Sequence, residues 1–201
     1  MLAAMDPRTT VTSHPDRFHA VRFYENKASL CRTVADFLAE GLTLGQPGLV
    51  IATPAHREAI VVELRSRHFD VEAIQAAGEL LFLDARAVLA TFMVDGMPDA
   101  ALFETHLPVA LDRLSRGRKD CTVRAYGEMV DVLWQDGTTA AAIRLEMFWN
   151  ELAMSHDFSL LCGYAMGSFY KDAGMRDICS HHSHVLPAES ALNRQRGASI
   201  N

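Results

Sequence analysis

The sequence predicts a single α/β domain with three layers, in which helices cover both faces of a mainly parallel β-sheet. Short apolar runs alternate with longer amphipathic segments along the chain, which is the pattern of strands joined by helical crossovers. Some runs, such as residues 48–53 (GLVIAT), are purely apolar apart from their ends, as in strands buried on both faces. A length of 201 residues with 49% hydrophobic and 22% charged residues suits one globular domain.

The elements follow from this alternation. Strands are expected over residues 19–25, 48–53, 80–85, 121–126 and 158–164, with an edge strand over 178–187. Helices are expected over residues 27–42, 55–67, 86–92 and 98–115, from near Glu128, and over 138–155. Loops are expected over residues 70–79 and 94–99. The polar ends, residues 1–17 and 188–201, are predicted to be disordered tails that flank a single domain over 18–187.

Capping residues set the ends of the first two helices. Asn26 precedes a run with helical apolar spacing and is a good N-cap. Gly41 and Gly45 are expected to end that helix, because glycine readily adopts the left-handed conformation of helix C-termini. Pro54 is expected to open the second helix, because proline is tolerated in a first helical turn.

Polar side chains gather where the predicted strands end. Because the carboxyl ends of parallel strands share one edge, and ligands of such sheets bind beyond that edge, these residues are expected to converge on one rim. The strand ends are Tyr24–Glu25, Thr53–His56, Asp84–Arg86, Tyr126–Glu128 and Cys162–Tyr164. For Glu128 a helix-dipole role in the next helix is an equally good interpretation. His56 alone would more often be a surface residue.

The helix over residues 138–155 carries polar residues inside an apolar stripe. Glu146 and Asn150 lie four apart and therefore share one helix face. Glu146 is interpreted either as a structural brace, hydrogen-bonded to His19 or Arg124, or as a ligand contact. Trp149 is either a core residue or a pocket wall. The predicted ligand-binding residues are Tyr24, Glu25, His56, Tyr126, Glu128, Glu146, Trp149, Asn150, Cys162 and Tyr164.

The order of several segments carries a family resemblance. Residues 35–60 and 78–86 resemble the RecA-like ATPase core of KaiC-type proteins. The segments HAVRFYEN, VRAYGEMVDVLW, LEMFWNELA and FSLLCGY, with a final His-Ser-His, resemble the MEDS domain, the methanogen/methylotroph sensory domain named for the DcmR regulator. This resemblance covers about residues 19–187. It implies a degenerate RecA-like fold and a sensory role, with hydrocarbon derivatives as the class of ligand.

Where a RecA-like ATPase has its phosphate-binding loop, this sequence lacks the residues needed for ATP hydrolysis. Residues 23–29 (FYENKAS) contain Lys27 and Ser29 but no glycine, whereas a Walker A loop needs the pattern G-x-x-x-x-G-K-[ST] to cradle phosphates. Glu25 would also repel a phosphate. The sequence contains no G-x-S-x-G elbow either. No catalytic residue, cofactor or metal ligand is therefore assigned, and the protein is not expected to be an enzyme.

Charge and cysteine content restrict the partners and the compartment. A formal net charge of −6 disfavours direct nucleic-acid binding, and the basic run at residues 113–119 is interpreted as a surface turn. No apolar run approaches the ~20 residues of a membrane span, and the first residues do not resemble a secretory signal. The four cysteines have no CxxC spacing. Reduced thiols in a cytoplasmic protein are therefore expected.

These observations predict a sensory domain that binds a small organic ligand and signals through a regulatory protein partner. They are also compatible with a homodimer. One alternative is a ligand-free interaction module in a kinase or anti-sigma-type pathway. Another is a metal- or haem-linked redox sensor that uses Cys162, Cys179 and the C-terminal histidines. In a strand, however, Cys179 and His181 would face one side and His182 and His184 the other, which gives at most two metal ligands per face.

Overall fold

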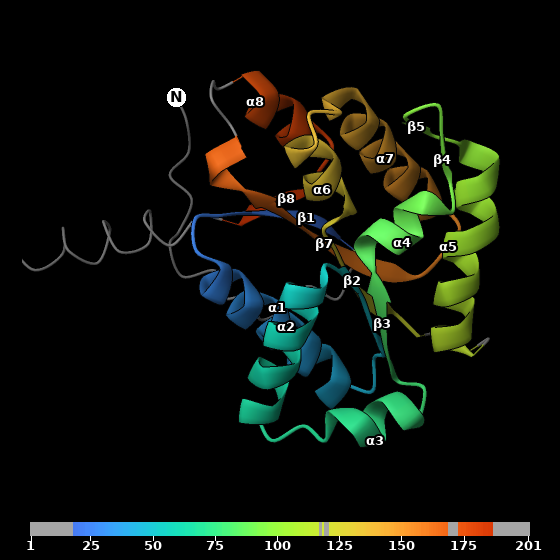
Figure 1. Ribbon diagram of the computed structural model, residues 1–201. Coiled ribbons are helices and arrows are strands. Elements are labelled where there is room, and N and C mark those ends of the chain that lie inside the picture. The colour runs from blue at the N-terminus through green and yellow to red at the C-terminus, as the bar shows by residue number, and fades with distance from the viewer. Residues whose placement is uncertain (1–17, 117, 119–120, 169–172, 187–201) are drawn as a thin grey trace, which may run out of the picture.

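The computed structural model describes residues 18–116, 118, 121–168 and 173–186 (Figure 1). The predicted tails, residues 1–17 and 188–201, lie outside the described residues. In the described part, six parallel strands form one sheet in the order β3-β2-β6-β7-β1-β8. These strands are β1 (His19–Tyr24), β2 (Gly48–Ala52), β3 (Leu80–Asp84), β6 (Val123–Gly127), β7 (Phe158–Ala165) and β8 (His184–Leu186).

Helices cover both faces of this sheet (Figure 1). On one face lie α1 (Lys27–Thr43), α2 (Pro54–Ser66) and α3 (Val71–Ala76). On the other lie α4 (Ala85–Ala90), α5 (Ala100–Ser115), α6 (Met129–Gln135), α7 (Thr139–Leu152) and α8 (Ala173–Ser180), and the 3-10 turn η1 (Met166–Ser168) follows β7. The prediction of a three-layer, RecA-like α/β fold with a parallel sheet is confirmed.

The sheet separates two apolar cores, because successive strand residues point to opposite faces. In β7, Leu161 packs into the core under α1 and α2, whereas Cys162 and Tyr164 pack into the core under α6 and α7. The same alternation holds in β1, where Tyr24 and Phe23 belong to different cores. Polar residues on one strand can therefore end in separate environments.

The predicted starts of the first two helices are confirmed. The side chain of Asn26 accepts hydrogen bonds from the backbone N–H groups of Ala28, at 2.8 Å, and Ser29, at 3.4 Å. This bonding satisfies two donors that the first turn of α1 leaves unpaired. Pro54 is the first residue of α2. The strand over residues 48–53 is β2, buried along its whole length.

The prediction that Gly41 ends α1 is wrong. The helix continues to Thr43, and only Gly45, with a φ of 74°, lies beyond its end. Gly41 serves another purpose, because a Cβ atom there would lie 2.3 Å from Cγ of Arg124. The buried guanidinium of Arg124 passes this position to donate to Gln46 at 2.7 Å. The missing side chain thus makes room for a buried cation.

Two segments predicted as loops contain short elements. Residues 70–79 include α3, which begins because the Asp70 carboxylate accepts a hydrogen bond from the N–H of Ala73 at 3.0 Å. Residues 94–99 overlap the antiparallel pair β4 (Met93–Val94) and β5 (Met97–Pro98). The helix predicted from Pro98 therefore starts at Ala100, with Asp99 as its N-cap.

The predicted edge strand over residues 178–187 is only partly correct. β8 spans three residues and pairs with β1 at the sheet edge, but the preceding residues through Ser180 belong to α8. Ile178 of this helix is fully buried against the α6–α7 core. The strand geometry assumed for Cys179 and His181 is therefore wrong. Among the described residues, no helix has the length and apolarity needed to cross a bilayer.

Candidate functional site

Two buried groups of polar side chains lie against the sheet. The first, called the Glu128 cluster, comprises Tyr24, His56, Tyr126, Glu128 and Asp131. The second, called the Glu146 cluster, comprises His19, Glu146, Asn150, Cys162, Tyr164 and His182. Buried polar groups are costly unless they are paired, so both clusters are candidates for function.

Glu128 lies between the end of β6 and the start of α6 and is 2% exposed. Its side chain makes no capping bond to α6. The carboxylate instead accepts hydrogen bonds from the N–H of Thr53 and from the hydroxyl of Tyr126, the latter at 3.1 Å. His56 Nδ1 lies 2.5 Å from Glu128 Oε2. Glu128 thus joins the carboxyl ends of β2 and β6.

His56 lies in the first turn of α2 and is buried, contrary to a surface role. Since its Nδ1 faces the Glu128 carboxylate, this nitrogen carries a proton. Its Nε2 atom is buried and has no hydrogen-bond partner within the described part of the chain. The Tyr24 ring meets the imidazole edge-on, with centroids 6.1 Å apart. An unpaired buried nitrogen costs about 1–3 kcal/mol, which a bound hydrogen-bonding group would recover.

Asp131 is a member of the Glu128 cluster that sequence reasoning missed. Its carboxylate accepts hydrogen bonds from the Tyr24 hydroxyl at 3.0 Å, from Gln135 at 2.7 Å and from the N–H of Ala165 at 3.0 Å. Burial raises the pKa of Asp131, and burial together with Asp131 raises the pKa of Tyr24. Its position three residues after Glu128, one helical turn along α6, was the available signal.

Glu146 of α7 is fully buried and organises the second cluster. Tyr164 donates to its Oε1 atom at 2.8 Å, and His19 Nε2 lies 3.2 Å from its Oε2 atom. The expected contact with His19 is confirmed, whereas Arg124 lies beside Glu40 and Gln46 instead. Burial alone would raise the pKa of Glu146, but the imidazoles of His182 and His19 hold it below its usual range.

Asn150 determines which ring nitrogen of His19 is the hydrogen-bond donor. The amide nitrogen of Asn150 donates to the carbonyl of His181 at 2.9 Å, so its oxygen faces His19 Nδ1, also at 2.9 Å. Nδ1 of His19 is therefore the donor, and its Nε2 atom points to the centre of the cluster, 3.3 Å from Cys162 Sγ. The i,i+4 spacing of Glu146 and Asn150 places both on the face of α7 that meets β1 and β7.

His182 completes the second cluster from the turn between α8 and β8. Its Nδ1 lies 2.7 Å from the carbonyl of Ile178, and its ring centroid is 4.1 Å from that of His19. Nε2 lies 3.5 Å from Glu146 Oε1 but has no hydrogen-bond partner in the described residues. Burial lowers the pKa of His182 to about 4, so the ring is neutral near pH 7. Burial, followed by Glu146, raises the pKa of Cys162.

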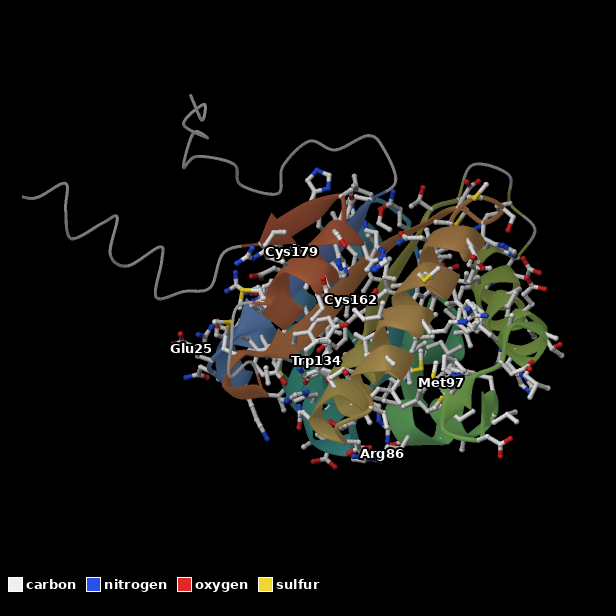
Figure 2. The ribbon with its side chains drawn as sticks, turned by 90° about the horizontal axis from the view of Figure 1, so that it is seen from above. Glu25, Arg86, Met97, Trp134, Cys162 and Cys179 are labelled. Atoms are coloured by element: carbon white, nitrogen blue, oxygen red, sulfur yellow. The ribbon has the colours of Figure 1, made fainter. Side chains whose placement is uncertain are left out.

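The predicted ligand-binding residues are divided between these clusters instead of sharing one rim. The Glu128 cluster holds four of them and the Glu146 cluster another four: Tyr24, His56, Tyr126 and Glu128, then Glu146, Asn150, Cys162 and Tyr164. Strand alternation causes the division, because neighbouring strand positions face different cores. Figure 2 shows Cys162 inside the fold and Glu25 at its periphery, where Glu25 is exposed.

Trp149 belongs to neither cluster. It is 1% exposed and packs edge-on against Phe103, with ring centroids 5.5 Å apart, and against Phe158 at 5.8 Å. Of the two interpretations given for Trp149, the structure places it in the core.

Gly163 of β7 leaves room for the Glu128 cluster. A Cβ atom at this position would lie 2.9 Å from the Tyr126 hydroxyl.

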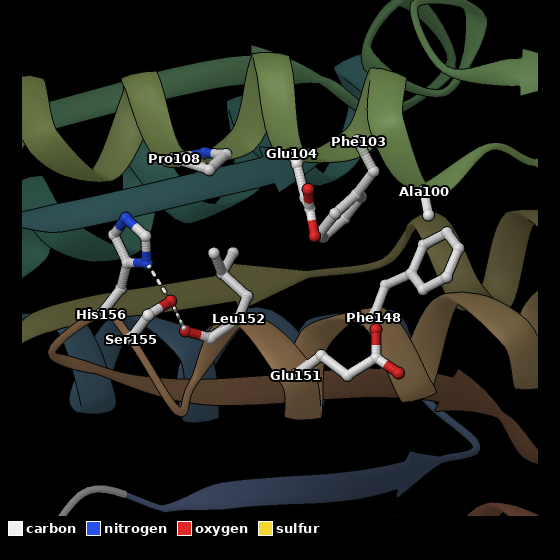
Figure 3. A pocket seen from close by; sticks show the side chains of 9 residues that line it. All are labelled: Ala100, Phe103, Glu104, Pro108, Phe148, Glu151, Leu152, Ser155 and His156. Carbon is white, nitrogen blue, oxygen red and sulfur yellow. Dashed lines mark hydrogen bonds between the residues drawn. The ribbon is translucent and has the colours of Figure 1, made fainter.

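Two surface pockets lie away from both clusters. One, of about 340 Å³, lies between α5 and α7 (Figure 3). The other, of about 440 Å³, lies between the end of α1 and α3. Neither is lined by a predicted ligand-binding residue. The α5–α7 pocket is lined by Ala100, Phe103, Glu104, Pro108, Phe148, Glu151, Leu152, Ser155 and His156.

Comparison with known protein families identifies a family of sensory domains. Residues 18–183 match a family model described as MEDS, the methanogen/methylotroph DcmR sensory domain. No curated protein matches the chain.

Proposed function

This chain belongs to the MEDS family of sensory domains, and on that premise we propose that it detects a small organic molecule at the Glu128 cluster and signals by association with another protein. The single observation that carries the proposal is the unpaired, buried Nε2 atom of His56. The opposite nitrogen is held by Glu128, so the imidazole is fixed in direction and Nε2 is left for a ligand.

The chemistry of the cluster favours a ligand with a polar group on a short apolar body. When Nδ1 holds the single proton of the imidazole, Nε2 of His56 is a hydrogen-bond acceptor, which suits a hydroxyl or amine donor. The ring of Tyr24 beside it offers apolar contact. A small hydrocarbon derivative carrying such a donor fits both features.

Burial of the cluster supports a sensor that changes conformation. Tyr24, His56 and Glu128 are all less than a tenth exposed, so a ligand reaches His56 only if α2 or the turn after β1 moves. A ligand that binds the open form more tightly shifts the population toward it by its difference in affinity. A regulatory partner, or a second copy of the chain, would then distinguish the two forms.

We propose binding without catalysis. β1 ends at Tyr24 and α1 begins at Lys27, so only two residues connect them. A phosphate-binding loop needs more residues at this position, including glycines, so that its backbone N–H groups can turn toward the phosphates. The short connection, with the acidic Glu25 in it, supports a sensor that does not hydrolyse nucleotides.

A ligand screen with matched variants tests the proposal. Thermal unfolding of the purified chain is followed with short-chain alcohols, amines, aldehydes, carboxylic acids and ATP, and hits are quantified by calorimetry. We expect His56→Gln to weaken binding of a hit at least about tenfold, since one lost hydrogen bond to a fixed partner amounts to roughly 1.4 kcal/mol. Glu104→Gln, in the α5–α7 pocket, is the control and should leave binding unchanged.

Other outcomes contradict the proposal in distinct ways. Loss of binding in Glu104→Gln but not in His56→Gln would place the ligand in the α5–α7 pocket. ATP turnover that disappears in Glu128→Gln would identify an enzyme. No stabilisation by any compound, together with a protein partner bound by the ligand-free chain, would support the interaction module. Light scattering of the chain with and without a hit determines whether the response involves a homodimer.

A further inference from the structure

Four potential metal-ligand atoms converge in the Glu146 cluster. They are Nε2 of His19, a carboxylate oxygen of Glu146, Sγ of Cys162 and Nε2 of His182, and all lie within 4.8 Å of one another. Tetrahedral zinc has bond lengths of about 2.0–2.3 Å, which separate its ligand atoms by roughly 3.3–3.8 Å. The distances from His19 Nε2 to Glu146 and Cys162 are 3.2 and 3.3 Å. Glu146 Oε2 lies 3.8 Å from Cys162 Sγ, and the other oxygen, Oε1, lies 3.5 Å from His182 Nε2.

Both histidines direct a lone pair to the centre of the cluster. Nδ1 of His182 donates to the Ile178 carbonyl, and Nδ1 of His19 donates to Asn150. In a neutral imidazole the other nitrogen is then an acceptor. Metal-binding histidines in proteins typically donate their second N–H to such a carbonyl or amide oxygen, which fixes the tautomer and the ring direction. The supporting shell of a metal site is therefore already present.

This arrangement needs a positive charge at its centre. The Cys162 thiol and the Tyr164 hydroxyl can donate to the Glu146 carboxylate, at 3.8 and 2.8 Å, but no donor faces the lone pairs that the two imidazoles direct to the centre. A proton shared by His19 and Glu146 would relieve that one contact but would leave His182 Nε2 without a partner, as observed among the described residues. One cation bound by all four atoms would satisfy the whole cluster.

We propose that the Glu146 cluster binds one divalent transition-metal ion of the zinc type, with His19, Glu146, Cys162 and His182 as its ligands. Nitrogen, sulfur and carboxylate donors are the set that zinc prefers, and four protein ligands make a closed, structural site. On binding, the Cys162 thiol loses its proton to solvent and the sulfur–metal bond forms. The thiolate and the Glu146 carboxylate then balance the two positive charges, so the buried site is neutral overall.

The ligands come from four separate parts of the fold. His19 begins β1, Glu146 lies on α7, Cys162 lies within β7, and His182 lies between α8 and β8. The ion would hold the α8–β8 segment against the centre of the sheet. The proposal goes beyond ligand sensing and is independent of it, because Cys162 and Glu146 lie in the core opposite to that of Tyr24 and Tyr126.

The test uses the full chain and three readouts. The metal content of the purified protein is measured before and after treatment with a chelator, the affinity for zinc is measured by competition, and cobalt(II) replaces zinc as a spectroscopic probe. We expect one ion per chain, ligand-field bands of tetrahedral cobalt, and a charge-transfer band from the thiolate. Cys162→Ser should remove the charge-transfer band, and His182→Gln should weaken zinc binding at least about tenfold.

Matched variants distinguish a ligand from a nearby thiol or imidazole. Cys179→Ser removes a cysteine of the preceding helix that is not in the ligand set, and should change neither affinity nor spectrum. Asn150→Ala, which removes the partner of His19 but no ligand, should weaken zinc by about 10–100-fold while keeping the thiolate band. Circular dichroism of each metal-free variant monitors folding, and if Cys162→Ser does not fold, His182→Gln decides by the same readouts.

The opposite results would overturn the proposal. A folded chain that binds no zinc, an octahedral cobalt spectrum without a thiolate band, or equal loss of binding in Cys179→Ser and His182→Gln would each exclude this site. None of these results bears on the sensing function proposed for the Glu128 cluster, whose test uses His56 and Glu104.

Discussion

His56 Nδ1 lies 2.5 Å from Glu128 Oε2, although the two residues are 72 positions apart in the chain. The pair joins the first turn of α2 to the end of β6, and both side chains are buried. The same carboxylate accepts hydrogen bonds from the Thr53 backbone and the Tyr126 hydroxyl. One side chain therefore connects two separate segments at the carboxyl edge of the sheet, the junction of β2 with α2 and the end of β6.

We expect Glu128→Gln to lower the free energy of unfolding by about 1–3 kcal/mol. The amide keeps the shape of the side chain but places an N–H₂ group where Thr53, Tyr126 or His56 now donates to an oxygen. Urea titration followed by circular dichroism measures the change. Glu104→Gln, on an exposed part of α5, should alter stability by less than about 0.5 kcal/mol. Equal effects of both substitutions would show that the Glu128 contacts contribute no stability.

Asp131 should make stability fall as the pH rises. Because burial raises its pKa in the folded state, the folded chain holds this proton to a higher pH than the unfolded chain, in which the pKa is about 3.9. The stabilising contribution is complete below that value and is lost as the pH rises through the folded-state pKa. The amide side chain introduced by Asp131→Asn does not titrate, so this pH-dependent contribution is absent from the variant.

The stability of wild-type protein relative to Asp131→Asn should therefore be greater near pH ~4 than near pH ~7. Urea titrations of both proteins across this range provide the comparison. A difference that stays constant, or that grows in favour of the wild type as the pH rises, would mean that the folded-state pKa is not raised.

Gly41→Ala should destabilise the protein, although alanine is ordinarily better than glycine inside a helix by roughly 0.5–1 kcal/mol. The new Cβ atom would displace the Arg124 side chain, which is hydrogen-bonded to Gln46 and packed over the Phe37 ring. We expect a net loss of about 1–3 kcal/mol, as in other overpacked sites. Thermal or urea unfolding measures it.

The Arg124→Ala background provides the control for this prediction. Without the long side chain, the same Gly41→Ala change should become neutral or stabilising, because only the helix preference remains. If Gly41→Ala costs the same in both backgrounds, the close approach of Arg124 is not the reason for glycine at this position.

Cysteine reactivity should follow burial. Cys179 is partly exposed, whereas Cys162 is fully buried beside Glu146. In the native chain we expect a thiol reagent such as iodoacetamide to label Cys179 well before Cys162, and unfolding to make the two rates similar. Mass spectrometry of peptides from timed reactions gives both rates. Faster labelling of Cys162 in the folded protein would contradict the buried geometry of the cluster.

Local sequence patterns were sufficient for most of the fold. The alternation of apolar runs with amphipathic segments predicts the parallel sheet, and Asn26 and Pro54 mark the starts of α1 and α2. These signals work because capping bonds and helix periodicity involve residues only a few positions apart. The short helix α3 was missed, although Asp70 is an N-cap of the same kind, because six residues carry little periodicity.

The sequence alone therefore determined the fold class, the family and most of the polar residues that are buried. Only the tertiary structure decided which of them meet. His19 and Cys162 come together across 143 positions, and His56 and Glu128 across 72. Strand alternation then places the strand residues of the two groups on opposite faces of the sheet. Long-range contacts of this kind depend on strand order and register, which no local pattern encodes.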